Sequence, residues 1–278
     1  MKIGIVGLGL IGGSLGLDFR AQGFSVLGIS RQEKTCLRAM EREAVDQASV
    51  DVSRLAQAEV IFLCTPIASI VPTLKTILPY LAPDTLVTDV GSVKAPIVEP
   101  CSLIWPNFVG GHPMAGTADQ GIEAAQFNLF NNAPYVLTPT GQTRSTDLEK
   151  MVSLIACLGA TLYQCTPESH DQAVAWISHL PVMVSASLIA ASLGEADSTI
   201  LKLAQQLASS GFRDTSRVGG GNPELGVMMT KYNRSALLRS LFSYREQLDQ
   251  VINLIETEQW QELEKLLQIT QRDRDLFL

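Results

Sequence analysis

The sequence predicts an α/β protein in which an N-terminal Rossmann-type, doubly wound sheet is followed by an all-helical domain. In the first half, short apolar runs alternate with helix-length segments, which is typical of a sheet covered by helices on both faces. A glycine-rich turn follows the first apolar run, as in dinucleotide-binding folds. After Cys165 the strand signals stop, and apolar residues recur only at helical spacing.

The expected strands are almost wholly apolar, which suits a parallel sheet buried on both faces. In chain order they cover residues 2–6, 25–29, 60–63, 86–88, 108–109, 135–138 and 161–165. Helix-length segments lie between them, among them residues 10–20, 32–43 and 146–158. This repeated alternation is the basis for predicting the doubly wound domain.

The helical half begins at Thr166-Pro167-Glu168, where a hydroxyl N-cap, a proline in the first helical position and an acidic first turn mark a helix start. We therefore predict a nucleotide-binding domain over residues 1–166 and a helical domain over residues 167–278. Pro181 is expected to kink or interrupt the first helix just after His179. Two later helices are expected from apolar residues at helical spacing, namely Leu237, Leu238, Leu241, Phe242, Leu248, Val251, Ile252 and Ile255, then Trp260, Leu263, Leu266 and Leu267.

Acidic residues outnumber basic ones, 28 to 21, which gives a formal net charge of −7 and a sequence pI near 5.0. This balance argues against a nucleic-acid or anionic-membrane partner. The five cysteines are scattered without a CxxC pair, so neither a disulfide framework nor a bound metal is expected. The longest later apolar run, residues 180–193, is shorter than the roughly 20 residues that span a bilayer. With no cleavage site after the N-terminal apolar stretch, the sequence predicts a soluble, cytoplasmic protein.

The segment Gly7-Leu8-Gly9-Leu10-Ile11-Gly12 lies between the first predicted strand and the first predicted helix. There the first glycine allows a tight turn, the second lets the backbone approach a pyrophosphate, and the third allows close helix–strand packing. Free N–H groups at the helix end would face the anion. The sequence therefore predicts a dinucleotide site that includes Gly7, Gly9, Leu10, Ile11 and Gly12.

The residues after the second predicted strand indicate which cofactor binds. NAD-preferring sites carry an acidic residue about 20 residues after the glycines, where it binds the ribose 2′-hydroxyl. This chain has Ser30-Arg31 instead, a hydroxyl and a cation that suit the 2′-phosphate of NADP. The alternative is a solvated Arg31, with Glu33 binding the ribose. The predicted NADP site is completed by residues that follow later strands at the same sheet edge, namely Thr65, Pro66 and Gly91.

Three more segments stand out: Asp89-Val90-Gly91-Ser92-Val93-Lys94, Gly110-Gly111-His112-Pro113-Met114-Ala115-Gly116 and Gly211-Phe212-Arg213-Asp214-Thr215-Ser216-Arg217. With the glycine turn and Ser178-His179-Leu180-Pro181, they resemble the prephenate/arogenate dehydrogenase family of tyrosine biosynthesis, in the family's order. The resemblance implies oxidative decarboxylation of a cyclohexadienol to a phenol, with hydride passing to a nicotinamide. It also implies a helical second domain that forms a homodimer.

The resemblance also assigns roles to individual residues. His112 resembles the family's catalytic histidine on a glycine-flanked turn, and an imidazole suits the removal of the hydroxyl proton. Ser92 matches the serine that hydrogen-bonds the same hydroxyl, although it could instead cap a helix. Arg217 matches the arginine that binds a substrate carboxylate. Arg213 could be a second clamp or a solvated neighbour, and His179 could face the substrate or be a core histidine.

Two other positions bear on the chemistry. His170 and Asp171, at a helix start, are interpreted as capping or interdomain groups rather than catalysts. Many prephenate-using relatives continue the Ser-His-Leu-Pro segment with a second histidine, where this chain has Val182. A histidine there could donate a hydrogen bond to the keto group of prephenate, whereas the ammonium of arogenate would gain nothing from it. We therefore predict arogenate as the substrate, with prephenate or dual use as alternatives.

Two rival functions share the fold. A β-hydroxyacid dehydrogenase would need a catalytic lysine in the helical half, but Lys202 and Lys231 lack the surrounding glycine-rich signature. A non-catalytic NADP sensor would have no use for Ser92, His112 and Arg217 together. The sequence therefore favours a dehydrogenase that acts on a small molecule.

Overall fold

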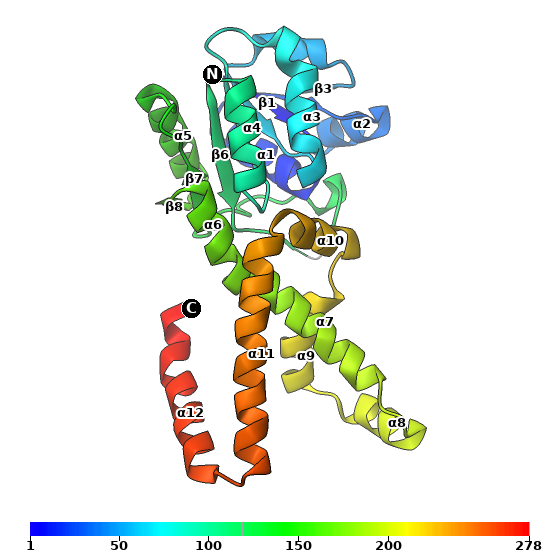
Figure 1. Cartoon of the computed structure of the whole chain (residues 1–278). Helices are drawn as coiled ribbons and strands as arrows, with labels where there is room; N and C mark the ends of the chain where they lie inside the picture. Colours follow the sequence, from blue (N-terminus) through cyan, green and yellow to red (C-terminus); the bar gives the residue numbers. More distant parts are fainter. Residues whose placement is uncertain (118, 278) are drawn as a thin grey trace.

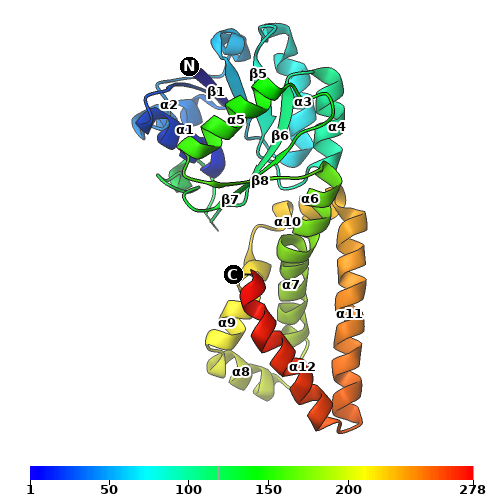
Figure 2. The same cartoon turned by 90° about the vertical axis from the view of Figure 1, so that its left-hand side faces the viewer.

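The computed structural model describes residues 1–117 and 119–277. Figure 1 shows an N-terminal α/β lobe from which the helical half extends, and Figure 2 shows both parts from the side. The first helix of the second half, α6 (Pro167–Val174), begins at the predicted residue. The Thr166 hydroxyl caps it by accepting the Ser169 N–H at 3.1 Å.

The N-terminal lobe is built on one eight-stranded sheet with the order β3-β2-β1-β4-β5-β6-β7-β8. The neighbours of β1 run parallel to it on either side, and the strand order reverses there, which is where doubly wound folds bind ligands. The predicted doubly wound domain is thus confirmed. The strands are β1 (Lys2–Val6), β2 (Ser25–Ile29), β3 (Gln47–Ser49), β4 (Val60–Leu63), β5 (Leu86–Asp89), β6 (Phe108–Pro113), β7 (Pro134–Thr138) and β8 (Thr161–Gln164).

The sheet differs from the prediction in three ways. It is mixed rather than wholly parallel, because β7 runs antiparallel to β6 with His112 opposite Val136. The pairing with β7 also extends β6 to Pro113, beyond the predicted end at Val109, where its pairing with β5 stops. The edge strand β3 was not predicted, since its three partly exposed residues form no apolar run.

Helices and short 3₁₀ turns cover both faces of the sheet. They are α1 (Leu10–Ala21), α2 (Glu33–Glu41), η1 (Val52–Gln57), α3 (Ile67–Ile77), η2 (Leu78–Tyr80), α4 (Ala95–Ile104), η3 (Ile122–Ala124) and α5 (Ser145–Cys157). Successive residues of β4 belong to different cores: Phe62 packs with Phe19 of α1, ring centroids 5.3 Å apart, whereas Ile61 lies in the core that contains Ile70 of α3. Burial on both faces explains why these strands are apolar throughout.

The second half is entirely helical among the residues that the structure describes, as predicted. After α6 come η4 (Ala175–His179), α7 (Leu180–Leu193), α8 (Ser198–Leu207), α9 (Ser210–Ser216), η5 (Arg217–Gly220), α10 (Pro223–Tyr232), α11 (Arg234–Glu256), α12 (Trp260–Asp273) and η6 (Arg274–Phe277). The helices α11 and α12 form an antiparallel pair (Figure 1).

Pro181 does not break the helix as expected. The segment η4 just before it is a π-helical turn, and the chain then continues through α7 to Leu193. A π turn widens the backbone ladder, so the missing N–H and the ring of a proline are accommodated without ending the helix. The predicted interruption is therefore a change of helix type. The segment 211–217 lies mostly in the short helix α9 (Ser210–Ser216).

The continuous helix Pro167–Leu193 has 27 residues and, by length and composition alone, is long and apolar enough to cross a membrane. The sequence analysis considered only the apolar run 180–193, which by itself is shorter than the roughly 20 residues that span a bilayer. Core helices of soluble proteins meet the same criterion. The polar residues His170, Asp171 and His179 are buried in this helix and hydrogen-bonded to other elements.

Candidate active site

The predicted dinucleotide turn has the backbone geometry that a pyrophosphate needs. Gly7 has φ +104°, and a Cβ added there or at Gly12 would overlap the carbonyl oxygen of Cys64 or of Gly7 respectively. By contrast, a Cβ at Gly9 would meet nothing within 4 Å, so the space above the turn is open. Gly9 is also the N-cap of α1 and provides no side chain to cover the first N–H groups. This cradle fits a bound phosphate group.

The other predicted cofactor residues lie at the same edge of the sheet. Because Val6, Leu63 and Asp89 are in register, the residues after β1, β4 and β5 converge there. The Thr65 hydroxyl is buried and has no hydrogen-bond partner among the described residues. Arg31 follows β2, is exposed, and forms no ion pair within the described part of the chain. Both groups are available to a ligand.

A buried ion pair supports the next two segments. The Lys94 ammonium contacts the Asp89 carboxylate and donates to the Gly111 carbonyl at 2.6 Å, and both charged side chains are fully buried. Asp89 also accepts the N–H groups of Gly91 at 2.8 Å and Gly111 at 3.2 Å. This pair ties the end of β5 to β6 directly before His112. Burial lowers the pKa of Lys94, while the charge of Asp89 opposes that shift.

His112 lies on the last part of β6, not on the turn that the sequence analysis expected. The preceding glycines allow this, since a Cβ on Gly110 would overlap Thr138 and Val98 side chains. The imidazole is 7% exposed. Its Nδ1 lies 2.8 Å from Nε2 of His170, a residue 58 positions later on α6.

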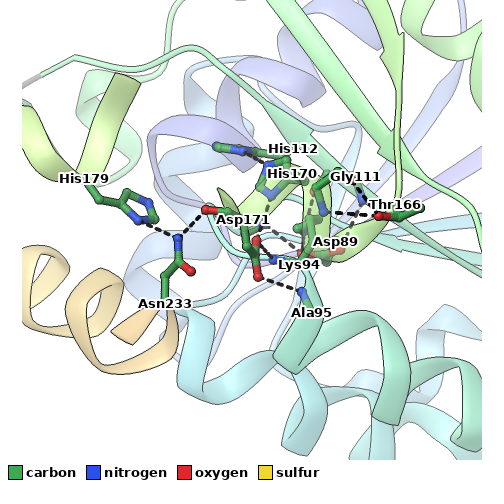
Figure 3. A network of polar contacts seen from close by, with 12 residues as sticks. Asp89, Lys94, Ala95, Gly111, His112, Thr166, His170, Asp171, His179 and Asn233 are labelled. Atoms are coloured by element: carbon green, nitrogen blue, oxygen red, sulfur yellow. Dashed lines mark hydrogen bonds and ion pairs between the residues drawn. The ribbon is translucent and has the colours of Figure 1, made fainter. Parts of the chain in front are cut away.

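Two residues interpreted as capping or interdomain groups extend this contact (Figure 3). His170 Nδ1 lies 2.8 Å from Oδ1 of Asp171. The Asp171 carboxylate accepts the N–H groups of Lys94 at 2.7 Å and Ala95 at 2.9 Å, so it caps α4 from the other domain. The interdomain role of Asp171 is therefore confirmed, whereas His170 also reaches the predicted catalytic histidine.

His112 is neutral at neutral pH. Burial lowers its pKa well below the usual value for histidine, and the nearby His170, Lys94 and His179 lower it further. A neutral imidazole has one nitrogen free to accept a proton, which is what the predicted base requires.

His179 and Ser92 both carry a buried polar atom without a described partner. His179 is fully buried on η4, with Nδ1 3.1 Å from the Asn233 amide nitrogen and Nε2 unpartnered. Burial lowers its pKa to about 4. The Ser92 hydroxyl is likewise unpartnered, and α4 begins at Ala95 with Lys94 as its N-cap, so Ser92 does not cap that helix.

The sequence analysis missed Asn233. Its amide donates to the Asp171 carbonyl at 2.7 Å as well as contacting His179. Asn233 is the N-cap residue of α11, but its side chain does not cap that helix, because its amide nitrogen contacts Asp171 and His179 instead. In the sequence, an asparagine directly before a long helical segment indicates a helix N-cap, so it does not predict the contacts with Asp171 and His179.

The two predicted arginines lie in the helical half, on α9 and η5. Arg213 is exposed on α9 and pairs with Asp214 at 3.0 Å, and Arg217 begins η5 and is also exposed. The described structure contains no hydrogen bond between either guanidinium and the histidines. The segment is nevertheless held against α7, since the Ser185 hydroxyl donates to the Thr215 carbonyl at 2.6 Å. Their substrate role stays a prediction.

A hollow of about 470 Å³ opens between α4, α6 and the start of α11. Its lining includes Asp171 and Asn233 but neither His112 nor the glycine turn. The predicted chemistry is therefore not centred on this hollow. Within the described chain, no group of three or more histidine, cysteine or acidic side chains could hold a metal ion.

Comparison with known proteins decides the family. Residues 15–164 match the family described as "Prephenate dehydrogenase, nucleotide-binding domain", and residues 166–269 match "Prephenate dehydrogenase, dimerization domain". The chain belongs to the prephenate dehydrogenase family. The resemblance found in the sequence is thus confirmed, and this member of the prephenate dehydrogenase family is an oxidoreductase with a nucleotide-binding domain.

Individual relatives carry two activity names. A Synechocystis arogenate dehydrogenase structure is 61% identical with a TM-score of 0.90, over 100% of both chains. A prephenate dehydrogenase from A. aeolicus, in complex with hydroxyphenyl propionate and NAD+, is 25% identical with a TM-score of 0.94, over 100% of this chain and 98% of that one. The Bacillus subtilis (strain 168) prephenate dehydrogenase is 29% identical over 98% of this chain and 74% of its own length.

Proposed function

We propose that the chain converts L-arogenate to L-tyrosine by oxidative decarboxylation, with NADP as the hydride acceptor. The observation that carries this proposal is His112, a buried neutral imidazole on β6 of the nucleotide-binding sheet, in a chain 61% identical to an arogenate dehydrogenase. A neutral histidine at this place suits proton removal from a hydroxyl.

Each predicted residue has a task in this reaction. His112 accepts the proton of the ring hydroxyl while hydride leaves the same carbon. The Ser92 hydroxyl, which has no described partner, hydrogen-bonds that oxygen and orients it. Bound NADP would take up the hydride. The bond between the ring and its carboxylate then breaks, carbon dioxide leaves, and the electron pair completes the aromatic ring as a phenolate, to which His112 returns the proton. Arg217 binds a substrate carboxylate, because a guanidinium fork fits two carboxylate oxygens.

The substrate choice rests on Val182, which is partly buried on α7 near His179. A valine cannot donate a hydrogen bond to the keto group of prephenate, whereas arogenate needs no donor there. The alternative is prephenate or dual use, and it is favoured by the names of the A. aeolicus and B. subtilis relatives. Arg213 and His179 are proposed to complete the substrate pocket.

The preference for NADP rests on Ser30 and Arg31. The guanidinium is exposed and forms no ion pair in the described structure, so it is available to the 2′-phosphate. Glu33, the alternative ribose ligand, is the first residue of α2 and is exposed.

Steady-state kinetics at 340 nm, with each substrate and each cofactor in turn, test these proposals. We expect the highest kcat/KM with arogenate and NADP. A prephenate kcat/KM equal to or above that for arogenate would refute the substrate assignment, and a preference for NAD would refute the cofactor assignment. The variant H112N tests the base, because undiminished turnover would exclude His112 from proton transfer.

We also propose a soluble, cytoplasmic homodimer formed through the helical half. Large apolar side chains remain exposed there, including Ile200, Leu203, Leu207, Phe242, Leu248, Ile252, Ile255, Trp260 and Leu267. Patches of this kind mark protein contacts or membrane contacts. The match to a dimerization domain favours a second copy as the partner. Light scattering on the purified chain should give twice 30.1 kDa, and a monomer would refute the proposal.

A further inference from the structure

Three residues form an unbroken chain of contacts from the sheet into the second domain. Nδ1 of His112 on β6 lies 2.8 Å from Nε2 of His170 on α6. Nδ1 of His170 lies 2.8 Å from Oδ1 of Asp171. The Asp171 carboxylate also accepts the N–H groups of Lys94 and Ala95, at 2.7 and 2.9 Å. All three residues are buried, and Figure 3 shows the contacts between them.

These contacts fix where the protons lie. A carboxylate can only accept, so the hydrogen between Asp171 and His170 must be on His170 Nδ1. When the His170 ring carries this one proton, its Nε2 has a lone pair and accepts. The hydrogen between the two rings must therefore be on His112 Nδ1. Only Nε2 of His112 is left with a lone pair.

We propose that His170 and Asp171 are positioning residues that hold His112 in the tautomer whose Nε2 accepts the substrate hydroxyl proton. This inference rests on the proposed function. In the reaction, the hydroxyl O–H bond breaks and the proton goes to Nε2, which gives an imidazolium whose Nδ1–H still donates to His170. Asp171, one residue further along, places a negative charge near the cation that forms.

The contacts of Asp171 explain why the device spans two domains. The carboxylate is held by two backbone N–H groups of α4, the helix that also carries Lys94. Asn233 donates to the Asp171 carbonyl at 2.7 Å and fastens α6 to the start of α11. Docking of the helical half therefore orients the base, and the nucleotide-binding domain alone lacks this orientation.

The first test reads the tautomer directly and needs no substrate. In ¹⁵N-labelled wild type, the imidazole nitrogen shifts of His112 should show a protonated Nδ1 and an unprotonated Nε2. H112N identifies the signals. A wild-type His112 protonated at Nε2 overturns the inference, whatever the enzyme proves to oxidise. Conversely, turnover that survives H112N would refute the proposed base while leaving the tautomer measurement valid.

The second test uses variants of His170, which leave the cap of α4 intact. H170F removes both ring nitrogens, whereas the amide oxygen of H170Q can still accept from His112 Nδ1. We expect H170F to lower kcat by on the order of 100-fold or more with little change in KM. The kcat of H170Q should be at least about tenfold higher than that of H170F. Equal kcat for H170F and H170Q, or equal kcat for H170F and wild type, overturns the inference.

The third test addresses Asp171 with a matched control. D171N offers an amide whose N–H₂ can reverse both hydrogen bonds and place a proton on His112 Nε2, so kcat should fall by about 100-fold or more. D147N makes the same substitution at a buried carboxylate on α5, which pairs with Arg144 just before that helix, and its kcat should be unchanged. A folded D171N within threefold of D147N in kcat, with the His112 tautomer unchanged, refutes the role of Asp171.

Discussion

Replacing Lys94 by methionine should destabilise the protein strongly, because it leaves Asp89 buried without its cation. Both side chains are 0% exposed, and after the change Asp89 keeps only the N–H groups of Gly91 and Gly111. Breaking a buried pair in this way costs about 3–5 kcal/mol of unfolding free energy. Urea unfolding followed by circular dichroism measures the loss.

The control is K265M, which removes an exposed cation from its pair with Glu262, side chains 65% and 53% exposed. That change should cost less than about 1 kcal/mol. The double variant K94M/D89N removes both charges and should recover roughly half of the K94M loss, since no buried charge is then left unpaired. Equal losses for K94M and K265M would show that Lys94 does not neutralise Asp89, and would refute the reasoning.

The K94M variant also leads to a kinetic prediction, which rests on the effect of the Lys94 charge on the pKa of His112. The pKa of His112 is lowered by burial first, then by His170, Lys94 and His179. Because removal of the Lys94 charge lets this pKa rise, the acidic limb of kcat/KM should move to higher pH in K94M. An acidic limb that moves to lower pH, or stays in place, would show that Lys94 does not lower the pKa of His112.

Three further predictions concern other parts of the chain. The pKa of His179 is lowered to about 4, so the unfolded state binds a proton before the folded state does as the pH falls. About 2 kcal/mol of unfolding free energy should therefore be lost between pH 7 and 5, and less in H179Q. Urea unfolding at each pH measures this loss. R31A should raise KM for NADP about tenfold, roughly one charge-assisted contact, without raising KM for NAD; equal changes for both cofactors would contradict the assigned 2′-phosphate contact. G7A places a Cβ against the Cys64 carbonyl at φ +104°, so calorimetry should detect weakened or lost dinucleotide binding, and wild-type affinity would exclude this turn.

The N-terminal fold could be predicted closely because its signals are local. A strand buried on both faces must be apolar at every position, and β1, β2 and β4 have the predicted bounds. β7 joins the sheet antiparallel because of the path that the chain takes between β6 and β7, and no pattern within β7 records that direction. Likewise, Pro181 indicates where a helix is disturbed, but neighbouring packing decides between a break and a π turn.

The candidate site was predicted in part, for the same reason. Gly7 and His112 belong to segments whose glycines have a local geometric cause. The contact between His112 and His170 joins residues 58 positions apart and exists only when the two domains dock. A histidine and an aspartate at a helix start look like ordinary capping groups when read alone, so their link to the base was not visible in the sequence.

A His112 with a lowered pKa fits the proposed chemistry better than a strongly basic group would. Burial first, and then the neighbouring His170, Lys94 and His179, keep its pKa low, so the ring stays unprotonated and its lone pair is available in the neutral range. A weak base suffices because the substrate hydroxyl becomes far more acidic as hydride leaves its carbon, when the group approaches a protonated carbonyl. The imidazolium that forms would be costly in this buried position beside the Lys94 ammonium, and the carboxylates of Asp89 and Asp171 offset that cost within the same buried layer. On this view, the acidic residues serve the base by balancing charge rather than by taking the proton.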